Sequence, residues 1–149
     1  MKKYHLSLLF CLLLHTSCFK SDTGIVTAPY AGMTTRVNGV QWSAIKVTGN
    51  IIIAGGDTAV IIAGEAANGQ KIQLNFSSYP IAPGIYYVDG SKPAASAYFY
   101  KTSSLHFTAN QGQIIIENIS SDSVRGVFNL KTTDSEMIDQ GNFTVILVH

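Results

Sequence analysis

Few side chains in this 149-residue chain could act as bases or nucleophiles. A hydrolytic triad requires a histidine base beside a nucleophile and an orienting acid. Beyond the apolar N-terminal stretch the only histidines are His106 and His149. Strand alternation would place His106 on the face opposite its neighbours Leu105 and Phe107. We therefore interpret His106 as a solvent-facing histidine and predict no serine hydrolase.

The nine acidic residues are the remaining candidates for acid–base or metal chemistry. Most of them fall at turn positions or strand ends, where their side chains have local structural roles. Asp134, Glu136 and Asp139 are closely spaced, and oxygen ligands of this kind suit calcium. Their spacing differs from that of a dedicated calcium loop, so we favour a solvated loop. We predict a protein that is not an enzyme and that holds no metal or cofactor, with a hydrolase as the least favoured function.

Aromatic side chains give the one indication of ligand binding. Alternation over residues 97–101 would place Tyr98 and Tyr100 on one face of a strand and Phe99 on the other. Because aromatic faces can stack on sugar rings, we name Tyr86, Tyr98 and Tyr100 as candidate ligand-stacking residues. A simpler interpretation is that the tyrosines cover a sheet with their hydroxyls in water, while Trp42 and Phe99 belong to the core. Both interpretations stay open at this point.

The first residues have the three-part layout of a secretory signal. A positive start, Met1-Lys2-Lys3, precedes the apolar segment Leu6–Leu14 and a small polar exit. The apolar segment is too short for a transmembrane helix, which needs roughly 20 residues. The end of the signal, Thr16-Ser17-Cys18, resembles the lipobox of bacterial lipoproteins, although His15 stands where leucine is typical. This resemblance implies cleavage before Cys18, acylation of its thiol, palmitate included, and attachment to a membrane.

Composition limits what the rest of the chain can be. The hydrophobic fraction of 46% is too high for a disordered chain, and a net charge of +1 makes nucleic acid an unlikely partner. Both cysteines, Cys11 and Cys18, lie at the N-terminus, so the remainder has no internal disulfide. We divide the chain into a signal peptide at 1–17, a lipidated tether at 18–32 and a β domain at 33–149.

The β domain shows short strand patterns separated by turn residues, without an amphipathic helix. Asn38-Gly39 and Asn68-Gly69 each predict a tight hairpin, because both residue types tolerate positive φ. The pattern predicts an all-β fold, an antiparallel β-sandwich or flattened barrel of about nine or ten short strands. Residues 105–108 and 113–118 are expected as separate strands, 44–53 as one kinked strand or two short ones, and 142–148 as a strand with apolar residues on both faces.

Two motifs carry a resemblance to a known family. Val37-Asn38-Gly39 with Trp42-Ser43-Ala44 forms a VNGxxWSA-like opening, and residues 125–130 form an RGxFxL-like late strand. Together they resemble a family of small Bacteroidota lipoproteins. The resemblance implies a β-rich, lipid-anchored domain and carries over no functional residue beyond Cys18. The triplets Asp57-Thr58-Ala59 and Asp122-Ser123-Val124 are also similar to the O-glycosylation acceptor of that phylum.

These observations predict a lipid-anchored protein of the cell envelope, in the outer membrane, on either its periplasmic or its surface side. Its domain is expected to bind a glycan or another envelope protein without catalysis. The alternative is a structural or assembly subunit, which an uncovered apolar edge strand at 142–148 would favour.

Overall fold

The computed structural model describes residues 31–54, 56–89, 94–120 and 123–148. The predicted signal peptide, Cys18 and nearly all of the predicted tether lie outside these residues. The described chain forms ten strands. It contains no helix, and therefore none that is long and apolar enough to cross a membrane. The predicted all-β class and number of strands are confirmed.

The strands follow one another in chain order with short connections. Their bounds are β1 (Gly32–Val37), β2 (Val40–Ser43), β3 (Lys46–Ala54), β4 (Asp57–Glu65), β5 (Lys71–Phe76), β6 (Gly84–Tyr87), β7 (Ala95–Tyr100), β8 (His106–Ile119), β9 (Ser123–Thr132) and β10 (Met137–Val148). Burial alternates residue by residue in β5, β7 and β9, as expected for strands with one face on a core.

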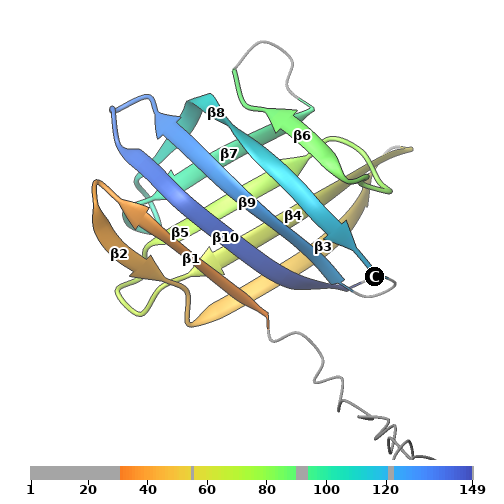
Figure 1. The fold of residues 1–149 in the computed structure, drawn as a ribbon, viewed down its shortest axis with the longest axis horizontal. Helices are drawn as coiled ribbons and strands as arrows, with labels where there is room; N and C mark the ends of the chain where they lie inside the picture. Colours follow the sequence, from red (N-terminus) through yellow and green to blue (C-terminus); the bar gives the residue numbers. More distant parts are fainter. Residues whose placement is uncertain (1–30, 55, 90–93, 121–122, 149) are drawn as a thin grey trace, which may run out of the picture.

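Seven of the strands close into a barrel in the order β3-β4-β5-β7-β8-β9-β10 (Figure 1). Six neighbouring pairs in this ring are antiparallel, and β10 pairs with β3 in parallel through Leu147 and Val148. A ring with only antiparallel neighbours needs an even number of strands. A seven-stranded ring must therefore contain a parallel pair, and this short pair is the one departure from the predicted antiparallel arrangement among the described strands.

Two long strands change partners along their length and so attach the strands outside the ring. In β8, residues 106–108 pair with β7 and residues 113–116 pair with β6. In β10, residues 138–144 pair with β1 and residues 147–148 pair with β3, while β9 lies along the other side. The strand at 142–148 is therefore not an edge strand, so the condition that would have favoured an assembly subunit is not met. The outer edges are β2 and β6, each four residues long.

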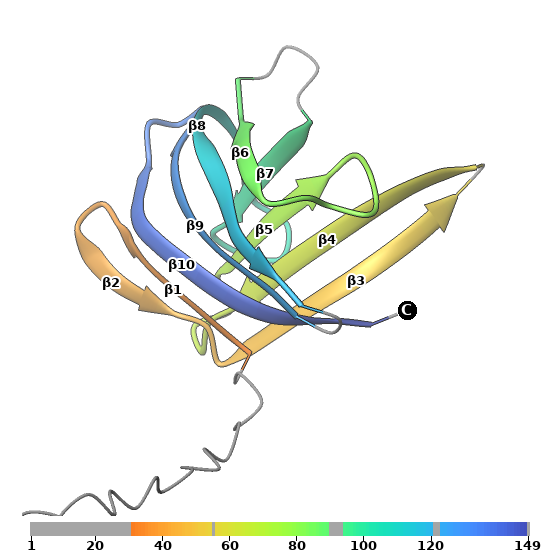
Figure 2. The ribbon, with the colours of Figure 1, turned by 45° about the vertical axis from the view of Figure 1, so that its right-hand side comes forward.

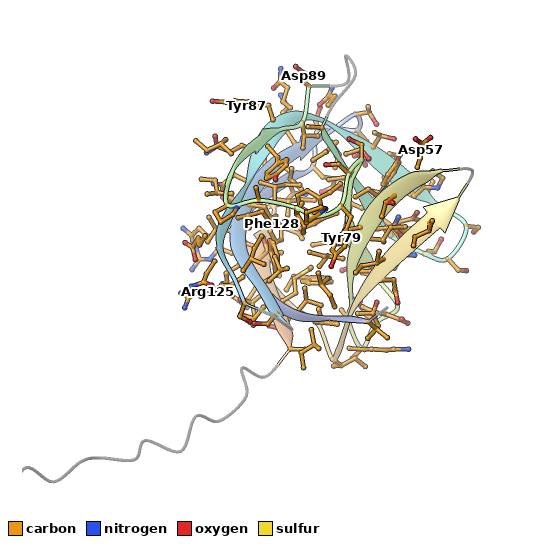
Figure 3. The ribbon with its side chains drawn as sticks, turned by 90° about the vertical axis from the view of Figure 1, so that its right-hand side faces the viewer. Asp57, Tyr79, Tyr87, Asp89, Arg125 and Phe128 are labelled. Atoms are coloured by element: carbon orange, nitrogen blue, oxygen red, sulfur yellow. The ribbon has the colours of Figure 1, made fainter. Side chains whose placement is uncertain are left out.

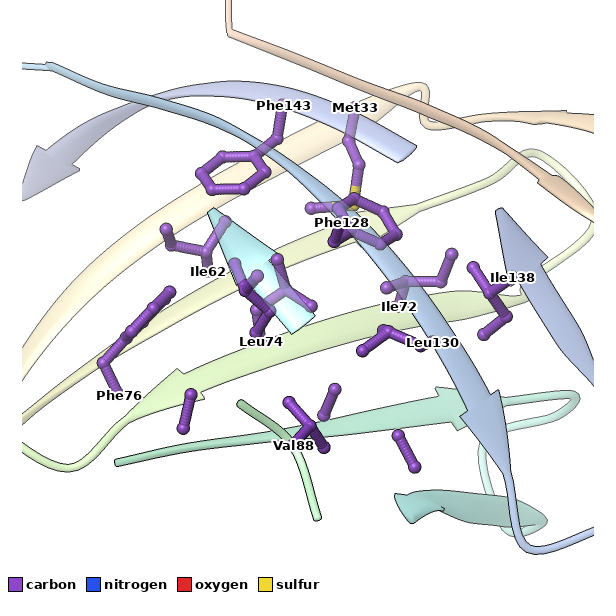
Figure 4. Packing of buried hydrophobic residues seen from close by; sticks show 14 of the residues in the cluster. Met33, Ile62, Ile72, Leu74, Phe76, Val88, Phe128, Leu130, Ile138 and Phe143 are labelled. Carbon is purple, nitrogen blue, oxygen red and sulfur yellow. The ribbon is translucent and has the colours of Figure 1, made fainter. Parts of the chain in front are cut away.

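The barrel is filled by apolar side chains rather than hollow at its centre. Phe128 and Phe143 come from neighbouring strands, and their ring centroids lie 6.3 Å apart (Figure 4). Trp42 and Phe99 are buried, which confirms that they belong to the core. Full burial of one large apolar side chain contributes about 1.5–3 kcal/mol, so packing can hold the domain without a disulfide. The largest buried side chains include Phe76, Phe99, Phe128, Phe143, Met33, Ile62, Ile72 and Leu74.

Two glycines lie in the segments where strand prediction was wrong or undecided. Gly112 has a φ of +134°, which lets the chain continue through a region that looked like a turn. The separate strands expected at 105–108 and 113–118 are therefore one strand, β8. Gly49 lies so close to β10 that an added Cβ would stand 2.8 Å from a methyl carbon of Val145. Residues 46–54 form one strand, β3, which pairs with β4 along its whole length.

Candidate functional site

The structure brings Tyr98 and Tyr100 together on the outside of the barrel. Phe99 between them points into the core, so alternation turns both tyrosines outward. His106 on β8 pairs with Tyr100, and its ring centroid lies 5.1 Å from that of Tyr100 and 6.1 Å from that of Tyr98. On the other side, β5 places Lys71 opposite Tyr100 and Gln73 opposite Tyr98. We call these five residues the tyrosine face.

The tyrosine face combines aromatic rings with a positive charge. Lys71 Nζ lies 4.0 Å from the centroid of the Tyr100 ring, a distance suited to a cation–π interaction. Among the described residues Lys71 forms no ion pair with a carboxylate. His106 is exposed, as predicted, and both tyrosines are half-buried. The face therefore offers ring surface, phenol hydroxyls and a cation to a ligand.

Tyr86 lies apart from these residues. Its position on β6, opposite buried Ile114, turns its side chain inward. Its ring meets Phe76 edge-on at 5.1 Å between centroids. The hydroxyl donates a hydrogen bond to the Ala82 carbonyl at 2.8 Å and accepts one from the Ala82 N–H at 3.0 Å. The exposed tyrosine of this strand is Tyr87, which is visible on the outside of the barrel in Figure 3.

The acidic cluster has a structural role that the sequence did not reveal. Asp134 lies 3.1 Å from Lys101 Nζ, and Glu136 forms a second ion pair with the same ammonium group. Both carboxylates are largely covered, with side chains 21% and 13% exposed, so the predicted solvated loop is wrong. Asp139 lies on β10, outside this ion-pair cluster. No group of three potential metal ligands occurs in the described residues.

These contacts shift the pKa values of Lys101 and Asp134. Hydrogen bonds to Glu136 and then to Asp134 raise the pKa of Lys101. For Asp134, desolvation by burial raises the pKa, but hydrogen bonds from Thr132 and Lys101 outweigh it. The pKa of the Asp134 carboxyl is therefore lowered overall. The hydrogen bonds stabilise the ion pairs in the folded state, whereas desolvation opposes them.

A cleft of about 600 Å³ opens at one end of the barrel. The turns after β1, β4, β7 and β9 gather at this end, on the left in Figure 1. The β1–β2 hairpin and the β4–β5 turn form its walls, and Trp42 and Phe99 line it together with the Lys101–Glu136 pair. We call it the end cleft. Sequence reasoning predicted both hairpins but did not place them side by side.

Asn38 ties the hairpin wall to the charged pair. Its φ of 52° is the left-handed conformation expected for an Asn-Gly turn. The Asn38 side-chain amide donates to Glu136, and its carbonyl oxygen accepts a hydrogen bond from the Met137 N–H at 2.9 Å. The wall is therefore fixed to the start of β10.

The two triplets similar to O-glycosylation acceptors lie in different surroundings. Thr58 is half-buried near the start of β4. Asp122 lies outside the described residues, and the Ser123 hydroxyl is 2.8 Å from that of Ser120.

Comparison with known proteins gives one match. The family model "Domain of unknown function (DUF6252)" matches residues 31–146. Searches of curated proteins and of solved structures found no match. The matched segment begins where the described fold begins and covers all ten strands almost to the end of β10. The chain therefore belongs to the DUF6252 family.

Proposed function

We propose that the protein is a lipid-anchored, non-catalytic binding domain of the cell envelope, held in the outer membrane through Cys18. The signal layout and the lipobox-like Thr16-Ser17-Cys18 support the anchor. The family match starts at residue 31, which is consistent with a tether between the anchor and the domain. Two or three acyl chains hold a protein on a membrane far more firmly than one, so lipid alone can supply the attachment.

The anchor is tested by a pair of cysteine variants. Cys18→Ser is expected to abolish incorporation of labelled palmitate and to release the protein from the membrane fraction. Cys11→Ser is the matched control, because Cys11 lies within the apolar segment of the signal and should leave both measurements unchanged. Labelling or membrane retention that persists in Cys18→Ser would overturn the anchor.

The domain is proposed to bind a glycan on the tyrosine face. The observation that carries this proposal is the contiguous group of Tyr98, Tyr100 and His106 on the outside of the barrel. Tyrosine offers a large apolar ring and a polar hydroxyl, a combination that suits the apolar face and the hydroxyls of a sugar. β5, β7 and β8 belong to the closed ring, so the rings are held in place before a ligand arrives. Such preorganisation reduces the entropy lost on binding.

Assembly by strand addition receives less support. The strand proposed for that role is flanked on both sides by other strands. The outer edges of the sheet, β2 and β6, are only four residues long, and short edges are one way in which proteins limit edge-to-edge pairing. An enzymatic role also gains nothing from the cluster beside the cleft, because Asp134 and Glu136 both pair with Lys101.

A thermal-shift screen of the full-length protein in detergent tests glycan binding. A glycan that binds only the folded state must raise the midpoint of unfolding. Tyr98→Ala and Tyr100→Ala are each expected to remove this shift. Tyr87→Ala is the matched control, since Tyr87 is 63% exposed and lies on β6, outside the tyrosine face. A shift that survives in both tyrosine-face variants, or that is lost equally in Tyr87→Ala, would contradict the proposal.

A further inference from the structure

The end cleft shares no residue with the tyrosine face and has its own chemistry. Its volume of about 600 Å³ falls within the range of roughly 300–1,000 Å³ found for small-molecule sites. The mouth of a β-barrel is also a recurring location for such sites. The polar groups in its lining determine which ligand the end cleft can hold.

Trp42 supplies a hydrogen-bond donor without a partner. The residue lines the end cleft and is 5% exposed. Within the described part of the chain, its Nε1–H is buried and makes no hydrogen bond. Buried indole N–H groups usually find an acceptor, because an unpaired donor loses the hydrogen bond it had with water. The nitrogen itself has almost no exposed surface, so an acceptor on a bound ligand would restore that bond once the side chains that cover the nitrogen move aside.

Side-chain amides around the end cleft provide further uncommitted groups. The Gln70 side chain lines the cleft and makes no hydrogen bond to another described residue. Asn68 uses its carbonyl oxygen to accept from the Gln70 backbone N–H at 3.1 Å, which leaves its NH₂ group available. Gln41 makes one long hydrogen bond, at 3.4 Å, to the Trp42 carbonyl. Amides both donate and accept, as do the hydroxyl and amide groups of sugars.

The charges at the end cleft argue for a neutral ligand. Lys101 and Glu136, the two charged residues in its lining, neutralise each other as an ion pair. Asp134 also pairs with Lys101, which gives the cluster one more negative than positive charge. A carboxylate or phosphate on a ligand would meet no unpaired cation in the lining and would face this excess negative charge.

We propose that the end cleft binds a small neutral saccharide, held by the Trp42 Nε1–H and by the amides of Asn68 and Gln70. This site is separate from the tyrosine face and does not depend on glycan binding there. A protein with both sites would contact sugars at one end of the barrel and on its adjoining outer face.

The single tryptophan of the chain gives this proposal a specific measurement. The indole N–H produces one peak in a ¹H–¹⁵N correlation spectrum, and that peak reports on the surroundings of Trp42, which lines the end cleft. We expect titration of the full-length protein in detergent with glucose or N-acetylglucosamine to shift the peak and to slow its hydrogen exchange. Glucuronate, the carboxylate analogue of glucose, is expected to bind about tenfold more weakly or not at all.

Variants separate the end cleft from the tyrosine face. Gln70→Ala is expected to weaken the titration by about tenfold, and Tyr98→Ala should leave it unchanged. Asn68→Ala is a second test, at an exposed position whose NH₂ group the proposal assigns to the ligand. The proposal is overturned if neither sugar moves the indole peak or if glucuronate binds as tightly as glucose. It is also overturned if both amide variants titrate like the unaltered protein, or if Tyr98→Ala abolishes the titration.

Discussion

The tyrosine face and the end cleft are built in opposite ways. The tyrosine face consists of side chains that alternate along three regular strands and are paired directly across the sheet. The end cleft lies where turns converge (Figure 1). There the Asn38 side-chain amide donates a hydrogen bond to the Glu136 carboxylate, 98 positions further along the chain. The difference teaches that a face depends on local alternation, whereas a cleft at the end of a barrel depends on closure of the whole ring.

The largest expected effect comes from removing a side chain on which both regions depend. Phe128 is fully buried, and its ring packs against Phe143 and over Gly141 (Figure 4). Phe128→Ala should reduce the free energy of unfolding by about 3–5 kcal/mol, measured by chemical denaturation. Binding at both regions should weaken together near the new midpoint. Loss of binding at one region alone would show that the two regions do not both depend on the packing of the barrel core.

A substitution in the hairpin wall should affect the end cleft and spare the tyrosine face. Asn38 combines a positive φ with side-chain hydrogen bonds to Glu136 and Met137. Asn38→Ala should cost about 1–3 kcal/mol of stability, because it loses these bonds and strains the turn. Asn38→Gly keeps the turn conformation and isolates the contribution of the side chain. Denaturation gives the energies, and the Trp42 indole peak should shift in both variants while the Tyr98 ring resonances stay in place.

The ion-pair cluster beside the end cleft predicts a pH dependence of the free energy of unfolding. The pKa of Asp134 is lowered in the folded state, so its stabilisation is present above the unfolded value of about 3.8 and is lost as pH falls through the folded pKa. The pKa of Lys101 is raised, so its contribution is present below about 10.5 and is lost as pH rises through the folded value. Denaturation below pH 4 should therefore show that acid lowers the free energy of unfolding less in Asp134→Asn than in the unaltered protein. Asp57→Asn, at the exposed first residue of β4, serves as the control, and an equal change in both would contradict this assignment.

The smallest effect is expected at a surface ion pair that belongs to neither region. Arg125 Nε lies 3.2 Å from Glu117, and the two side chains are 70% and 40% exposed (Figure 3 shows Arg125 on the outside). Arg125→Ala should change stability by about 1 kcal/mol or less and leave both titrations unaltered. It sets the background against which the other variants are judged. A change in sugar binding would mean that this surface also contacts the ligand.

Local patterns predicted the elements of the tyrosine face. Alternation around Phe99 was sufficient to turn Tyr98 and Tyr100 outward, and the Asn-Gly pairs marked both hairpins of the end cleft. The continuity of β8 was missed, because it depends on the positive φ of Gly112 and on pairing with β9. Without the strand order, no pattern could bring Lys101 to Glu136 or the two hairpins to one end of the barrel.

Strand β10 also has a consequence for how the chain reaches its native state. It pairs with β9, β1 and β3, and the buried Thr35 hydroxyl of β1 donates to the Asp139 carbonyl of β10 across 104 positions. Strands β1 and β3 can pair early with β2 and β4, but each lacks its second neighbour until β10 is in place. Folds dominated by such distant contacts form slowly, because the loops between the contacts must close first. Closure of the barrel is thus the step that must wait for β10, and we expect it to limit the rate at which the domain folds.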